Sequence, residues 1–153
     1  MSRARVLRGL GIGVIVAILI LQLVPYGRRH TNPAGRVEPG WDSPTTRGLA
    51  VRACYDCHSN ETVWPWYSHV APVSWLVQRD VDEGRRKLNF SAWDRPQKEA
   101  RESAKTVRKG EMPPWFYPLI QREARLTAAE TRALLAGLEA TLGTKDRKGS
   151  RSR

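Results

Sequence analysis

The chain contains only two cysteines among its 153 residues, and a histidine directly follows the second, in Cys54-Tyr55-Asp56-Cys57-His58. Two cysteines cannot build a framework of disulfides. On one helical turn, however, both thiols share a face, where each can form a thioether with a haem vinyl group, and the next residue then brings its imidazole beneath the iron. We therefore predict one covalent haem c, attached at Cys54 and Cys57, with His58 as the proximal iron ligand.

The cysteine pair is open to three other interpretations. A thioredoxin-like redox pair normally follows a strand in an α/β unit, and no such unit is predicted here. Half of a zinc site is a poor fit because there is no further cysteine, and His30 and His69 lack zinc-finger spacing. The third is a chance occurrence on a helix. Haem attachment is the interpretation that we adopt.

A second axial ligand has few candidates. Met1 is the initiator, so Met112 is the only thioether left, in Gly110-Glu111-Met112-Pro113-Pro114. The prolines fix φ and remove backbone donors, so this strap can hold a flexible side chain against the iron. We predict Met112 as the distal ligand. His69 is the alternative, an open sixth position is another, and His30 is a weaker candidate.

Aromatic residues follow the motif closely, at Trp64, Trp66 and Tyr67. They are candidates for the haem pocket, with indole N–H and phenol groups reaching a propionate, or for ordinary core packing. Further along, Arg85, Arg86 and Lys87 either pair with propionates or face water, and water is the expectation for each of them.

The N-terminal segment is strongly apolar. Residues 9–24 contain one polar side chain, Gln22, and no charge, and three arginines precede them. No small-x-small cleavage site follows, so we favour an uncleaved signal anchor over a removed signal peptide. The positive-inside rule then leaves the N-terminus cytoplasmic and places the haem domain on the exported, periplasmic side of the cytoplasmic membrane.

The remaining chain predicts an all-α, cytochrome c-like small helical domain behind this transmembrane helix. Helices are expected from Ser43-Pro44 into the cysteine motif, over 72–87, over 95–109 with Asp94 as cap, and after the capping box Thr127-Ala128-Ala129-Glu130 up to Gly143. We divide the chain into a signal anchor (1–24), a linker rich in proline and glycine (25–40), a haem-binding domain (41–143) and a disordered basic tail (144–153).

The formal net charge is +11, with much of the excess at the two chain ends. Such a balance favours anionic lipid headgroups or an acidic protein partner. No nucleic-acid-binding motif is present, and export would remove the chain from the cytosol, so we expect a redox protein and the membrane as partners, and no nucleic acid.

Five stretches resemble the small bacterial exported haem-binding-domain family. They are residues 55–62 (YDCHSNET), 64–68 (WPWYS), 71–77 (APVSWLV), 82–91 (DEGR, then LNFS) and 110–114 (GEMPP). The resemblance covers about residues 41–142 and implies a single covalent haem and export. It departs at Gln121-Arg122-Glu123-Ala124, where the family often has His-Pro-Glu-Ala, so a histidine role there cannot operate.

One-electron transfer at the outer face of the membrane is the expected function, and the chain is then a carrier rather than an enzyme. The alternative is a haem sensor or peroxidase-like enzyme with an open or displaceable sixth ligand. A third possibility is an assembly subunit docked on a respiratory complex through its anchor.

Overall fold

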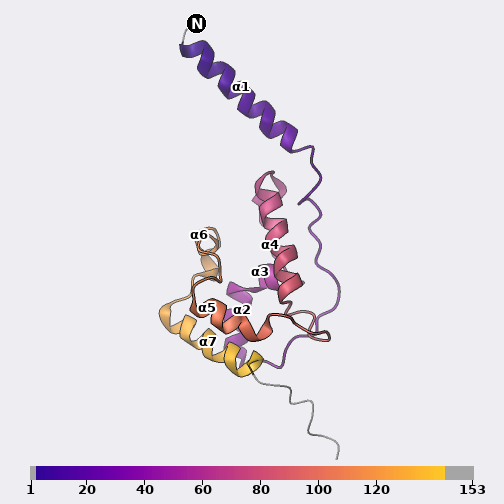
Figure 1. The fold of residues 1–153 in the computed structure, drawn as a ribbon, viewed down its shortest axis with the longest axis vertical. Coiled ribbons are helices and arrows are strands. Elements are labelled where there is room, and N and C mark those ends of the chain that lie inside the picture. Colours follow the sequence, from indigo (N-terminus) through magenta and orange to yellow (C-terminus); the bar gives the residue numbers. More distant parts are fainter. Residues whose placement is uncertain (1–2, 144–153) are drawn as a thin grey trace, which may run out of the picture. The chain divides into compact units, whose positions relative to one another are not determined.

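A computed structural model describes residues 3–143, and this range is all-helical apart from one isolated bridge between Val37 and Ala92 (Figure 1). The predicted all-α class with an N-terminal apolar helix is confirmed. The fold divides into two compact units, unit 1 (Met1–Thr31 with Val63–Asp80) and unit 2 (Asn32–Thr62 with Val81–Arg153). The predicted domain boundaries stay a prediction, and the tail at 144–153 lies outside the described residues.

Unit 1 begins with α1 (Arg3–Leu21), a helix of 19 residues with none of them buried. At 1.5 Å per residue it is about 28 Å long, of which the uncharged part after Arg8 makes up about 20 Å. It is long and apolar enough to cross a membrane. The rest of unit 1 holds a short 3-10 helix, η1 (Trp66–His69), and the first half of α4 (Val73–Lys87).

Unit 2 is built around α2 (Pro44–Ala53), α5 (Ser103–Arg108) and α7 (Ala128–Leu142). Ser43 caps α2 by accepting a hydrogen bond from the Thr46 amide at 3.1 Å, as its position before Pro44 predicted. A buried apolar cluster joins the three helices to the segment after α4; its members are Leu49, Ala50, Tyr55, Leu88, Phe90, Ala100, Ala104, Leu134, Leu138 and Leu142. This cluster is the core on which the cysteine motif rests.

The last helix matches its prediction. Thr127 accepts a hydrogen bond from the Glu130 amide at 3.2 Å, and the Glu130 carboxylate accepts one from the Thr127 amide at 2.7 Å. This reciprocal capping box begins α7, and Gly143 follows its last residue. Gly137 of α7 faces Thr46 so closely that a Cβ there would overlap the Thr46 side chain.

The third predicted helix begins later than expected. Residues 95–109 were predicted to be helical, but the structure has a 3-10 turn, η2 (Ala100–Glu102), followed by α5. The Gln97 side chain accepts from the Asn89 amide at 2.8 Å and donates to the Ala92 carbonyl at 2.6 Å, which holds residues 89–97 as a loop. Asp94 is therefore not a helix cap. The predicted end at Gly110 is confirmed, since its φ of 72° is a left-handed conformation that glycine accepts readily.

Candidate functional site

The cysteine motif forms one helical turn at the end of α2. Cys54 closes that helix, and its carbonyl accepts from the amides of Cys57 at 3.2 Å and His58 at 2.9 Å. The turn is α3 (Tyr55–His58). Both thiols are half-buried. Burial, and then the neighbouring Cys57, raise the pKa of Cys54 to about 12, so this thiol is neutral at pH 7.

His58 is held by two backbone carbonyls. Its Nδ1 lies 3.1 Å from the Gly84 oxygen and 3.0 Å from the Leu88 oxygen. Carbonyl oxygens only accept hydrogen bonds, so Nδ1 carries the proton and Nε2 carries a lone pair. Burial lowers the pKa of His58, although the two carbonyls act in the opposite direction. A neutral imidazole with a free Nε2 is the form that binds a metal, and the hydrogen bonds at Nδ1 orient the ring.

Gly84 allows α4 to approach the motif. A Cβ at this buried position would lie 2.9 Å from the carbonyl carbon of Cys57 and would overlap the carbonyl oxygen. The close approach also brings the Gly84 carbonyl to His58. This role was not predicted from the sequence, although a glycine inside an otherwise regular helix is a signal for it.

The residues after the motif are fastened by side chains rather than by regular structure. Ser59 donates to the Tyr55 carbonyl at 2.8 Å, and Thr62 donates to the Asp56 carbonyl at 2.6 Å. Arg85 donates to the Ser59 carbonyl at 2.7 Å and to the Thr62 hydroxyl at 2.9 Å. The expectation that Arg85 faces water is therefore wrong, because its guanidinium holds this loop.

Arg86 and Lys87 follow the expectation. Arg86 is exposed, and it pairs with Glu83 at 3.4 Å, while Lys87 lies 3.8 Å from the same carboxylate. Surface pairs of this kind contribute little to stability.

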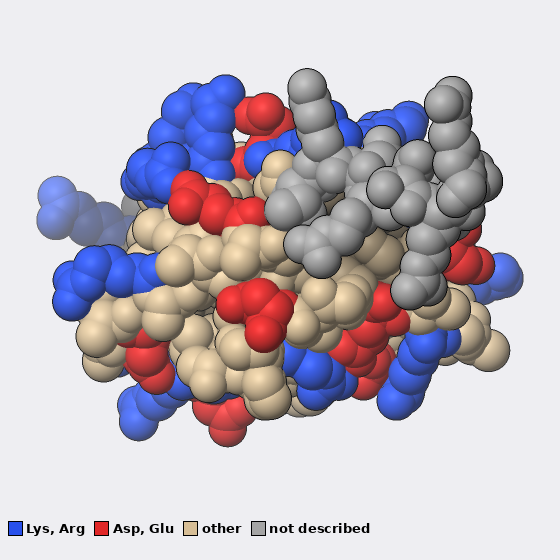
Figure 2. Space-filling view, turned by 90° about the horizontal axis from the view of Figure 1, so that it is seen from below, with Lys and Arg blue, Asp and Glu red and all other residues tan. Residues whose placement is uncertain are grey.

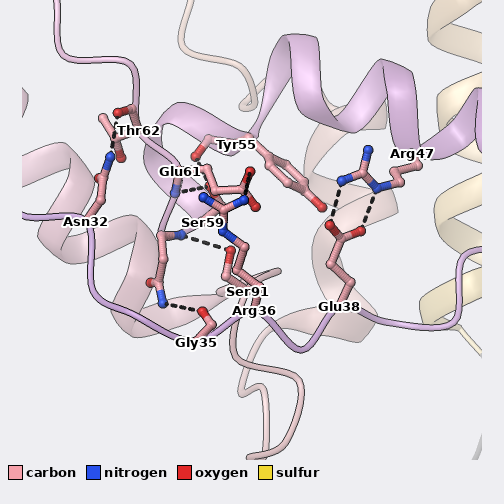
Figure 3. Close-up of polar contacts among 11 residues, drawn as sticks. Asn32, Gly35, Arg36, Glu38, Arg47, Tyr55, Ser59, Glu61, Thr62 and Ser91 are labelled. Atoms are coloured by element: carbon pink, nitrogen blue, oxygen red, sulfur yellow. Dashed lines mark hydrogen bonds and ion pairs between the residues drawn. The ribbon is translucent and has the colours of Figure 1, made fainter.

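An extended segment, residues 32–38, runs beside this loop (Figure 3). Asn32 donates to the Thr62 carbonyl at 3.0 Å, and the Gly35 carbonyl accepts from Asn60 at 3.3 Å. At the end of the segment, Glu38 pairs with Arg47 of α2 at 2.6 Å. The segment thus links the start of α2 to the loop after the motif.

A hydrogen bond ties the segment that carries Met112 to the cysteine motif. Tyr117, the first residue of α6 (Tyr117–Ile120), donates to Asp56 Oδ2 at 2.6 Å. Burial, then this hydrogen bond, raise the pKa of Tyr117 above its usual range. Met112 itself is 37% exposed, and other apolar side chains of the segment are exposed too: Trp115, Phe116, Leu119 and Ile120. The segment therefore presents an apolar surface that is anchored to the cysteine motif.

Four predicted site residues belong to unit 1, whereas the motif belongs to unit 2. Trp64 stacks on His30 with ring centroids 4.3 Å apart, and the His69 ring lies edge-on to the His30 ring, also with a centroid distance of 4.3 Å. The rings of Trp66 and Tyr67 pack edge-to-face, with centroids 5.9 Å apart. Their roles as pocket residues, and His69 as alternative ligand, stay predictions.

Comparison with known proteins gives one match. A family model described as a haem-binding domain matches residues 16–140. No curated protein and no solved structure matches the chain.

Proposed function

Because this chain belongs to the haem-binding domain family, we propose that it holds one haem c, attached through Cys54 and Cys57, with His58 as proximal iron ligand. The observation that carries the proposal is the pair of backbone carbonyls, of Gly84 and Leu88, that face His58 Nδ1. They leave Nε2 as a lone-pair donor, on the same turn as the two cysteines of the chain. This donor set fits a covalent haem.

The exposed apolar surface of the Met112 segment supports the same proposal. A haem is a large apolar ring, and exposed apolar side chains next to its attachment points would be covered on binding. Met112 is the distal ligand in this proposal, and Tyr117 keeps its loop beside the motif through Asp56.

One-electron transfer is the proposed activity. Bound haem supplies an iron that changes between ferric and ferrous states. The protein orients the proximal imidazole through the Gly84 and Leu88 carbonyls, and a thioether ligand with an apolar surround raises the reduction potential. No side chain is required to act as an acid or base.

The proposed location is the cytoplasmic membrane, with α1 as an uncleaved anchor and the haem unit exported. The distribution of charged residues along the chain is compatible with this location. Residues 32–62 and 81–143 carry fifteen Lys and Arg against thirteen Asp and Glu, so the basic excess lies in the terminal segments. On the face drawn in Figure 2, acidic and basic side chains are interspersed. Attraction to an acidic redox partner or to anionic lipid would then depend on the terminal arginines and lysines.

Extraction of the haem tests the covalent attachment. The full chain, produced with a c-type maturation system, should keep its haem after treatment with acidified acetone. The Cys54→Ala/Cys57→Ala double variant should lose it, whereas Met112→Ala should keep it, because the thioethers are intact. Haem that is fully extractable from the unaltered protein would contradict the proposal.

A further inference from the structure

The end of α1 is bonded to a loop that is distant in sequence. Gln22 Nε2 donates to the Ala71 carbonyl at 3.0 Å, and Gln22 Oε1 accepts from the Ala71 amide at 3.0 Å. Gln22 is also the one polar side chain of residues 9–24. Both polar groups of Ala71 are therefore satisfied at the last turn of the apolar helix, and the loop is held there.

Two further contacts fasten the same segments. Gly27 has a φ of 75°, and a Cβ there would lie 2.7 Å from the Ser74 carbonyl carbon, so the chain passes very close to the start of α4. His30 Nε2 lies 2.9 Å from the carbonyl oxygen of Ser68. Residues 22–30 and 68–74 thus form one structure at the end of α1.

Outside α1, unit 1 exposes large apolar side chains. Trp66 is 78% exposed and Leu23 is 79% exposed. Others are exposed to a smaller extent: Val24, Tyr26, Val63, Val70, Val73 and Leu76. Exposed Trp and Tyr close in sequence or in the fold to an apolar helix are typical of the membrane–water interface.

The length of the apolar helix points the same way. After Arg8, the helical residues up to Leu21 span about 20 Å, which is shorter than the ~30 Å core of a bilayer. The uncharged run continues to Gly27. A span that is too short draws the residues that flank it into the interface. Here the flanking residues include the loop that Gln22 holds.

We propose that the part of unit 1 outside α1 is a second membrane contact, in which Trp66 and the other exposed apolar side chains lie in the interfacial layer of the bilayer. Arg28 and Arg29, both exposed, then lie at the level of the anionic headgroups. This inference rests on the proposed anchoring of α1. It assigns Trp66 to lipid contact, whereas the sequence analysis made it a candidate for the haem pocket.

Photo-crosslinking in the membrane tests the assignment. The full-length holoprotein is reconstituted in vesicles of phosphatidylethanolamine and phosphatidylglycerol, with Trp66→p-benzoylphenylalanine in one sample and Ile15→p-benzoylphenylalanine in another. Both positions are exposed, so the substitutions are tolerated. After irradiation, mass spectrometry should find phospholipid adducts at both positions. Gln22→Ala should lower the yield at position 66 and leave the yield at position 15 unchanged.

The two positions separate the possible failures. Adducts at position 15 but not at 66, or a protein adduct at 66, would show that α1 is anchored and that the interfacial assignment is wrong. No lipid adduct at either position would overturn the anchoring itself, and this inference with it. An undiminished yield at 66 in Gln22→Ala would overturn the role of Gln22.

Discussion

Gly84→Ala is expected to destabilise the protein although it removes a glycine from a helix. The added Cβ would overlap the Cys57 carbonyl oxygen and lie 3.1 Å from the Cys57 Cβ. The oxygen belongs to the backbone of the motif, so it cannot rotate away as a flexible side chain would. Either α4 or the motif must shift, and a shift of α4 also moves the Gly84 carbonyl away from His58.

The magnitude follows from two opposing effects. Replacing glycine by alanine inside a helix contributes up to about 1 kcal/mol of stability. Forcing an extra carbon into a packed site costs about 1–3 kcal/mol, and occasionally more. We therefore expect a net loss of up to about 2 kcal/mol. Gly48 is the matched control, since it lies in α2 with no atom within 4 Å of its ideal Cβ, so Gly48→Ala should gain up to about 1 kcal/mol.

Urea unfolding in detergent, followed by helical circular dichroism, measures both variants against the unaltered chain. The absorption spectrum of the haem gives a second readout, because displacement of the His58 acceptor should weaken proximal ligation in Gly84→Ala only. A Gly84→Ala protein that is as stable as Gly48→Ala would refute the argument, because the two sites would then not differ in packing.

Three further outcomes are expected. Met112→Ala should lose the weak red charge-transfer band of a sulfur–iron bond, have a lower reduction potential and bind carbon monoxide more tightly. His69→Ala should change none of these properties. Rapid carbon monoxide binding by the unaltered ferrous protein would favour a sensor or peroxidase. Tyr117→Phe removes a hydrogen bond to a carboxylate, so the free energy of unfolding should fall by about 1.5–3 kcal/mol, and the charge-transfer band of Met112 should weaken. An unchanged band would show that this hydrogen bond is not needed for Met112 to bind the iron. The pKa of Glu130 is lowered to about 2, first by the hydrogen bond from the Thr127 amide and then by Arg52. The ionised carboxylate therefore stabilises the fold fully above its ordinary pKa of 4.5, and this stabilisation is lost as the pH falls towards 2. In Glu130→Gln the melting temperature should lack this decrease at acid pH, and the same pH dependence in both proteins would contradict the argument.

The sequence by itself determined the features that depend on neighbours within one or two helical turns. The spacing of Cys54, Cys57 and His58 places all three on one turn, because three residues are nearly one turn of helix. The capping box of α7 depends only on Thr127 and Glu130, three positions apart. The apolar helix near the N-terminus depends on composition alone.

Other features were decided by contacts between residues distant in sequence. The Nδ1 proton of His58 is fixed by carbonyls of α4 and the residue after it, which no spacing near the motif reveals. The late start of α5 has the same kind of cause: the Trp93 amide donates to the Val37 carbonyl at 2.8 Å, while Gln97 binds Asn89 and Ala92. Local helix propensity there is overridden because a loop with satisfied backbone groups is available.

The difference between local and distant causes also explains what sequence reasoning missed at the site. Arg85 reads as a surface cation until the Ser59 carbonyl and the Thr62 hydroxyl are brought to its guanidinium. Gly84 reads as a weak helix residue until α4 meets Cys57. Residue types and spacing identify which groups can do the chemistry, whereas only the packed chain decides which backbone carbonyl faces which side chain, because that depends on how separate segments approach.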